Sequence, residues 1–365
     1  MRWFALIAVL TAPIAQACIN DRDTLSFEIR NVDALNRITN ETDFRKKAAA
    51  IQELALKAIG GRFERYPPKY YEMRIERLEA KPSLTAAEFD DLAVAYDRLG
   101  KVDRAIGIIL ESEKERKTGE DTYRFHANYG TFLVHQWIVR GASRKNINLL
   151  KRSIQQIQAA LKINPNSHFG RERAQLQLQL SWLYPGKNGL NYEKVRGMLS
   201  NEDLLVGLAG ISMMGLGYEL PDLYMLMAKS YLVGGASTSM LQEFAALRAR
   251  ELVSQGKPFI VEQHIPPSRG TDEVRQAYVK LRRDGQRVHI ARLAYMNPRL
   301  ERGEHPDTNP NFWADWEEPA VPVLRIIQRS AVERVLTPGF YIILGTVATV
   351  AILVLLGRRR RVRTT

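Results

Sequence analysis

The sequence predicts an all-α protein, because its apolar residues recur at helical rather than strand spacing. Phe89, Leu92 and Tyr96 lie at i, i+3 and i+7 and therefore share one helix face. A second apolar series begins at Ala105, directly after Gly100, so two helices joined by a short turn are expected. Such a helix pair exposes apolar edges and needs neighbours to cover them.

The pair at residues 86–117 has the residue types and offsets of a known repeat. In order, these are a large residue, Leu, a small residue, Tyr, Gly, Ala and an aliphatic residue: Phe89, Leu92, Ala93, Tyr96, Gly100, Ala105 and Ile109. The segment resembles a tetratricopeptide repeat, a unit of about 34 residues. It departs from the pattern at Ser112, where Ala is usual, and at Lys117, where Pro is usual. The resemblance implies a solenoid of stacked hairpins, in which large residues such as Tyr96 fill the gaps and the first helices line a concave groove.

A second unit is indicated by AALKINPN, residues 159–166. Ile157, Ala160 and Pro165 carry the mutual spacing of the last three pattern positions, and Pro165 forbids another regular helical turn. Its first helix would be 122–137. The separation of the two helices is about eleven residues too long for the repeat, so we expect an extended loop within 138–149.

A third unit is predicted at residues 221–257. The residues that fit its offsets are Tyr224, Met227, Ala228, Tyr231, Gly235 and Phe244. The resemblance therefore places TPR-like repeats at 86–255. Two upstream helical stretches, 45–61 and 67–80, are expected to cap the array within an N-terminal region at 18–85.

The first residues resemble a secretory signal. Residues 1–17 contain Arg2, a short apolar run and a small residue at both ends of Ala15-Gln16-Ala17, which predicts removal after Ala17. Cys18, the only cysteine, would then begin the mature chain, and no intrachain disulfide can form. Whether Cys18 carries a lipid stays open, because Ala15 stands where a lipoprotein signal usually has Leu.

The other end predicts a single membrane span at 338–357. Its last eighteen residues carry no charged side chain, which is close to the length of about 20 residues that a spanning helix needs. The tail, 358–365, contains five arginines and is expected to stay in the cytoplasm. The chain is thus predicted to be a single-pass protein of the cell membrane, with its bulk periplasmic or extracellular. Whether the anchor is later processed stays open.

Residues 256–337 lose the repeat pattern and are predicted to form C-terminal helices and a stem. Residues 271–296 have the pattern of one interrupted helix. The amphipathic stretch 321–336 fits either the outer membrane surface or an extension of the stack. Trp313 and Trp316 fit either interfacial anchors or residues that close the last apolar edge.

The charge excludes little beyond nucleic acid. The 53 basic side chains include Arg2 and the five tail arginines, which leaves 47 against 40 acidic ones and a net charge of about +7. An excess of this size over so long a chain is ordinary, and an extracytoplasmic location disfavours nucleic acid further.

The sequence has no recognisable catalytic motif, so no catalytic residue, cofactor or metal ligand is predicted. Zinc-protease, nucleophile-elbow and phosphate-loop patterns are absent. His126 and His135 are nine residues apart and lack the i, i+4 spacing of a helical metal pair.

The predicted function is that of a scaffold that binds a protein or peptide. The resemblance places five polar residues at groove-facing offsets: Asp90, Asp97, Arg124, His135 and Lys229. They do not reproduce the Lys/Asn clamp with which some family members hold C-terminal carboxylates. An envelope hydrolase with a His/carboxylate site in the groove is the alternative, and an assembly platform for an envelope machine is a third possibility. The partner's identity and the oligomeric state do not follow from the sequence.

Overall fold

The structure is a computed structural model. It describes residues 20–24, 26, 41–165, 167–187, 189–191, 199–214, 216–232, 239–261, 265 and 270–320. Every regular element in these ranges is a helix, and the only β-type pairing described is an isolated bridge between Gly186 and Gly189. The all-α prediction is therefore confirmed.

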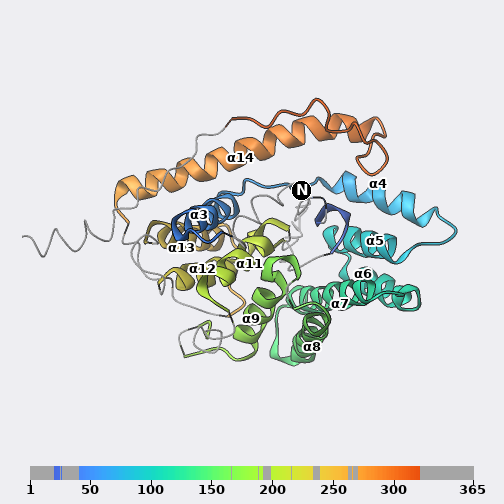
Figure 1. Ribbon diagram of the computed structural model, residues 1–365, viewed down its shortest axis with the longest axis horizontal. Helices are drawn as coiled ribbons and strands as arrows, with labels where there is room; N and C mark the ends of the chain where they lie inside the picture. Colours follow the sequence, from blue (N-terminus) through green and yellow to red (C-terminus); the bar gives the residue numbers. More distant parts are fainter. Residues whose placement is uncertain are drawn as a thin grey trace, which may run out of the picture.

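The first half of the molecule is a row of helices, each packed against the next (Figure 1). They are α4 (Pro68–Glu79), α5 (Ala86–Arg98), α6 (Val102–Glu111), α7 (Gly119–Val139), α8 (Ile147–Ile163) and α9 (Arg171–Leu183). Helices α5 and α7 also contact each other. Contact between the first helices of successive hairpins is the packing that a stack of helix pairs requires.

Local sequence explains the α5–α6 hairpin. Thr85 caps α5 in a capping box with Glu88, in which the Glu88 backbone N–H donates to Thr85 Oγ1 at 3.3 Å. Gly100 takes a left-handed φ of 77° in the turn between the helices, where a side chain would be strained. Leu92 is buried as expected, but Tyr96 is only partly buried, and its hydroxyl donates to Glu79.

The α7–α8 hairpin absorbs its extra residues differently from the prediction. Helix α7 continues to Val139 and α8 begins at Ile147, so only seven residues connect them, including the 3-10 turn η2 (Arg144–Asn146). The excess length therefore lies mostly in longer helices. Gly130 allows close packing of the pair, since a Cβ there would lie 2.9 Å from Ile157 Cδ1. Helix α8 ends at Ile163, before the expected Asn-Pro stop.

The second half contains α11 (Asn201–Met214), which packs against α9, and the pair α12 (Pro221–Leu232) and α13 (Ser239–Ser254). Helix α3 (Phe44–Gly60), expected to cap the start of the array, packs against α11, α13 and α14 instead (Figure 1). The capping surface next to α5 is provided by α4. Helix α3, which is near the start of the described chain, thus packs with helices from its second half.

Helix α14 (Asp272–Glu301) runs along one side of the molecule and contacts α3, α13 and α4 (Figure 1). Its 30 residues span about 45 Å at about 1.5 Å per residue. The expected interruption does not occur, and the helix continues through Gly285. The lack of a side chain at Gly285 permits close packing against the end of α3. This helix, within the region predicted to contain C-terminal helices and a stem, packs on the other helices of the protein.

Two apolar cores lie under α14. One is formed mainly by α3, α9 and α11–α13, and the other by α4–α7 together with Met296, Leu300 and Phe312. Trp313 stacks on Tyr295 with ring centroids 5.4 Å apart, and so covers an edge of the second core. This contact favours the edge-closing interpretation of Trp313.

No helix in the described ranges is long and apolar enough to cross a membrane. The predicted signal (1–17), lipid site (Cys18), surface helix (321–336), span (338–357) and tail (358–365) lie outside the described residues and stay predictions.

Candidate functional site

The predicted groove residues Asp97 and His135 form a hydrogen-bonded pair that is closed to solvent. His135 Nδ1 lies 2.9 Å from Asp97 Oδ1, and both side chains have no solvent-exposed surface. The pair joins α5 to α7 in the interior of the protein. Neither group can therefore contact a partner or a dissolved substrate in this structure, and the pair's evident role is to fix the spacing of the two helices.

Asp90 is also buried, and Arg116 binds both of its carboxylate oxygens at 2.8 and 2.9 Å. Burial raises the pKa of Asp90 above its usual value, while the hydrogen bond and charge of Arg116 oppose that rise. The Asn128 amide nitrogen donates to the same carboxylate at 3.0 Å. Asp90 thus connects α5 to α7 and to the segment that precedes α7.

The other two predicted residues lie apart from each other. Arg124 on α7 is partly exposed and donates to Glu120 one turn earlier at 2.9 Å. Lys229 on α12 is half-buried, and desolvation lowers its pKa; its Nζ lies 3.4 Å from the Leu190 carbonyl oxygen. The structure therefore brings Asp90, Asp97, Arg124 and His135 onto neighbouring helices, and places Lys229 in the other half.

The inner face of α5 and α7 is occupied by the chain itself. Residues 20–24, here called the N-terminal segment, lie there with Asn20, Asp21 and Thr24 buried. The Asn20 backbone N–H donates to Asn128 Oδ1 at 2.7 Å, and Asn128 Nδ2 donates to the Asn20 carbonyl at 2.9 Å. One side-chain amide thus satisfies both main-chain groups of one residue.

Asp91 on α5 holds the next part of the N-terminal segment. The Arg22 backbone N–H donates to Asp91 Oδ1 at 2.9 Å, and the Arg22 side-chain Nε donates to Asp91 Oδ2 at 2.7 Å. Because both carboxylate oxygens are engaged by one residue, the position of Arg22 is defined by main chain and side chain together.

Arg74 on α4 connects the N-terminal segment to the C-terminal end of the described chain. Its guanidinium is fully buried and donates to Asp23 at 2.8 Å and to Asp307 at 2.8 Å. Asp21 lies nearby, where burial and the charge of Asp23 raise its pKa to about 6. Buried charges of this kind must be paired, since an isolated one is costly. The network therefore depends on all three segments being in place.

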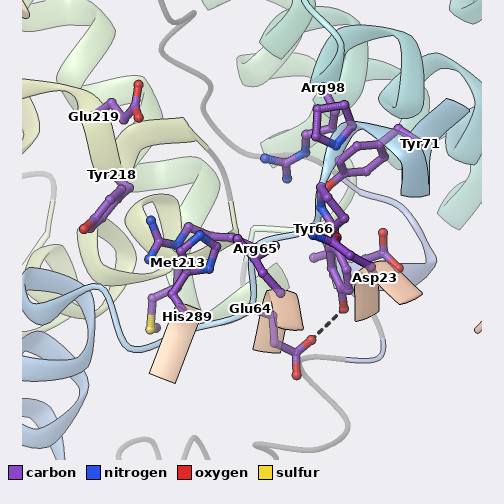
Figure 2. A pocket seen from close by; sticks show the side chains of 15 residues that line it. Asp23, Glu64, Arg65, Tyr66, Tyr71, Arg98, Met213, Tyr218, Glu219 and His289 are labelled. Atoms are coloured by element: carbon purple, nitrogen blue, oxygen red, sulfur yellow. Dashed lines mark hydrogen bonds between the residues drawn. The ribbon is translucent and has the colours of Figure 1, made fainter. Parts of the chain in front are cut away.

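A cavity of about 370 Å³ adjoins the N-terminal segment (Figure 2). Its walls come from that segment, the α3–α4 connection, α4, α5, the end of α11, the turn η4 (Leu216–Glu219) and α14. The lining residues are Asp23, Thr24, Glu64, Arg65, Tyr66, Pro67, Pro68, Tyr71, Arg98, Met213, Tyr218, Glu219, His289, Leu293 and Asn297.

Two basic residues on one side of this cavity lack full pairing within the described chain. Arg65 Nε and Nη2 and His289 Nδ1 are buried without a hydrogen-bond partner there. Burial and the nearby Arg65 and Arg292 lower the pKa of His289 to about 4, so the ring is neutral at pH 7. Figure 2 shows Arg65 and His289 close together, with Tyr71 and Arg98 on the opposite side.

The most informative site residues, Asn20, Arg65 and Asn128, were not predicted from the sequence. Asn128 interrupts the apolar stretch of α7, and a polar residue at such a position is a signal of a required hydrogen bond. Nothing local marks Arg65 or Asn20, because their surroundings come from distant segments.

Comparison with known proteins gives no match among family models, curated proteins or solved structures. Within the described ranges, no group of three or more His, Cys, Asp or Glu residues is placed to hold a metal ion. The inner face of α5 and α7 and the cavity are therefore the structural features that bear on function.

Proposed function

We propose that this protein is a membrane-anchored TPR-like scaffold that holds a polypeptide segment of a partner protein outside the cytoplasm. The binding surface is the inner face of α5 and α7, around Asn128 and Arg124, which a partner would reach by displacing the N-terminal segment. The proposal combines the repeat pattern of the sequence with a contact in the structure.

The main support is the pairing of Asn128 with the backbone of Asn20. An amide that donates to a carbonyl and accepts from the N–H of the same residue recognises main chain, whatever side chain that residue carries. The N-terminal segment is thus an internal example of the ligand that this face can hold.

Arg124 lies one turn before Asn128 on the same face of α7. Its positive charge opposes the rise in the pKa of Asp90 that burial causes, and its side chain is 27% exposed. Among the five predicted groove residues, Arg124 therefore combines access to solvent with a position beside the N-terminal segment. It is the residue with which a partner would make contact first.

The cellular location is proposed from the two ends of the sequence. The signal at 1–17 would deliver the chain across the membrane, and the span at 338–357 would retain it. The arginine-rich tail 358–365 would then lie in the cytoplasm.

Site-specific photo-crosslinking in intact cells tests the function. A photoreactive residue would replace Arg124 in one full-length variant and Val279, which is 61% exposed on α14, in a control variant. A third variant with the probe at Arg22 reports folding, because its neighbour Asp91 should give an intrachain crosslink. We expect an adduct with another protein from position 124 that is absent from position 279.

Asn128→Ala removes the amide that would hold the main chain of either occupant, so it should not strengthen the adduct from position 124 even though it releases the N-terminal segment. A stronger adduct would mean that Asn128 holds only the segment and not the partner. An intrachain crosslink from position 22, together with adducts at 124 no stronger than at 279, would show a folded protein without a partner on this face. That result would refute the proposal.

A further inference from the structure

We propose that the cavity beside the N-terminal segment binds a small organic anion, with Arg65 as the residue that holds its carboxylate or phosphate group. This site is separate from the polypeptide-binding face and does not depend on it.

The positive charge of Arg65 has no acidic partner among the described residues, although acidic residues line the same cavity. Glu64 accepts from Tyr66 at 2.7 Å and pairs with Arg292 at 3.1 Å. Asp23 is bound by Arg74, and Glu219 by Lys257 at 3.0 Å. Each acid is thus engaged elsewhere, and none of them pairs with Arg65.

The two unsatisfied donors of Arg65, Nε and Nη2, lie on one edge of the guanidinium group. Two parallel N–H groups on such an edge match two oxygens of a carboxylate or phosphate. Arg65 now lies over Tyr218 and Phe63, at 4.8 and 5.6 Å from their ring centroids, with both nitrogens closed to solvent. Binding therefore requires the guanidinium to rotate from these rings toward the cavity.

The remaining walls favour an apolar, flat body attached to the anion. Tyr66, Tyr71 and Tyr218 supply aromatic surface, and Met213 and Leu293 supply aliphatic surface. His289 adds a neutral ring with an unpaired Nδ1 that can form one hydrogen bond to the ligand. A volume of about 370 Å³ lies at the lower end of the range for small-ligand sites, which is roughly 300–1,000 Å³.

An unpaired, largely desolvated cation lowers stability, so its presence needs a compensating role. If that role is ligand binding, replacing Arg65 with Met should leave the ligand-free protein as stable as the wild type, or more stable. If Arg65 is a structural residue, the same change should lower the melting temperature.

The test uses the full chain in detergent and four probes: phenyl phosphate, benzoate, inorganic phosphate and neutral benzyl alcohol. We expect at least one aromatic anion to bind saturably in calorimetry and to raise the melting temperature, with benzyl alcohol and inorganic phosphate at least tenfold weaker. The tighter aromatic anion identifies the headgroup. Arg65→Met should weaken its binding at least tenfold, and Arg65→Lys, which keeps the charge but not the paired donors, should be intermediate.

Arg104→Met is the matched control, because Arg104 is 55% exposed and lies on α6, away from the cavity. It should bind the probes like the wild type. The proposal is overturned if neither aromatic anion binds saturably, if inorganic phosphate binds as tightly as both aromatic anions, or if Arg65→Met binds them undiminished. It is also overturned if ligand-free Arg65→Met melts well below the wild type; in that case Arg65→Lys, which retains a cation, should melt close to it.

Discussion

Gly285 of α14 lies so close to the end of α3 that a Cβ built on it would be 2.1 Å from the carbonyl oxygen of Gly60. No side chain can be accommodated at that distance. The contact is where the long C-terminal helix meets the first helix of the described core.

Gly285→Ala should therefore destabilise the protein strongly, by roughly 2–4 kcal/mol, because α14 must shift away from α3. Gly107→Ala is the matched control: Gly107 also lies in a helix, and a Cβ added to it would meet no other atom within 4 Å. That change should be neutral or stabilising by up to about 1 kcal/mol. Thermal unfolding of both variants followed by circular dichroism decides the matter, and equal melting temperatures would contradict the close contact.

His135→Ala should cost about 3–5 kcal/mol, because it leaves the Asp97 carboxylate buried without its imidazole partner. His126→Ala on the same helix removes a hydrogen bond to Gln156 from a partly buried site and should cost only about 1 kcal/mol. Urea unfolding measures both values. A loss for His135→Ala no greater than that for His126→Ala would argue against the buried pair.

Asn128→Ala should release the N-terminal segment while the helices remain folded. The substitution removes two hydrogen bonds to Asn20, worth roughly 1–2 kcal/mol, and a third to Asp90. Loss of the two bonds to Asn20 should speed hydrogen exchange at the amides of Asn20 and Arg22 by about 5- to 30-fold. Gln136→Ala, at a partly exposed position on the same helix whose side chain bonds Asp103, should leave these amides unaffected. Exchange measured by mass spectrometry on peptides that cover residues 18–26 provides the readout; unchanged protection would mean that Asn128 does not hold the segment.

Asp21→Asn should stabilise the protein at neutral pH and have little effect in acid. The pKa of Asp21 is raised to about 6 in the folded protein from an ordinary value of 3.8, so the folded state binds more protons between these values. Stability therefore falls as the pH rises from about 4 to 6, by up to about 3 kcal/mol for this group. Asparagine removes the charge and keeps the oxygen that accepts from the Thr24 N–H at 2.9 Å.

The measurement is the difference in unfolding free energy between Asp21→Asn and the wild type from pH 4 to pH 8. It should be near zero at pH 4 and favour the variant above pH 6. Glu72→Gln, at an exposed position on α4, is the control and should show no such trend. A difference that stays constant with pH would exclude a raised pKa at Asp21.

Much of the helical architecture could be predicted from local sequence. The offsets of Leu92 and Ala105 and the Asn-Pro stop after Ile163 identified helix pairs at their observed positions. Helical periodicity and chain-breaking residues are local properties, so one sequence is enough to find them. The predicted length of the loop after Val139 was wrong, because the local sequence does not distinguish a longer helix from a longer loop there.

The candidate site could not be predicted to the same extent. Asp90, Asp97 and His135 were placed on an open groove by their offsets, but their burial depends on Arg116, on each other and on the N-terminal segment. Offsets give the face of a helix and do not say whether another part of the chain covers it. Arg74 and Asp307 are more than two hundred residues apart, and only the fold brings them together.

Helix α14 contacts helices from both halves of the molecule, including α3 and α4. In an open array, duplication of a hairpin adds a unit and leaves the others undisturbed. Here an inserted hairpin would move the two groups of helices apart, while α14, which contacts both groups, would keep its length. Gain or loss of a whole helix pair would therefore require α14 to change length at the same time, whereas changes in single residues or loops would not.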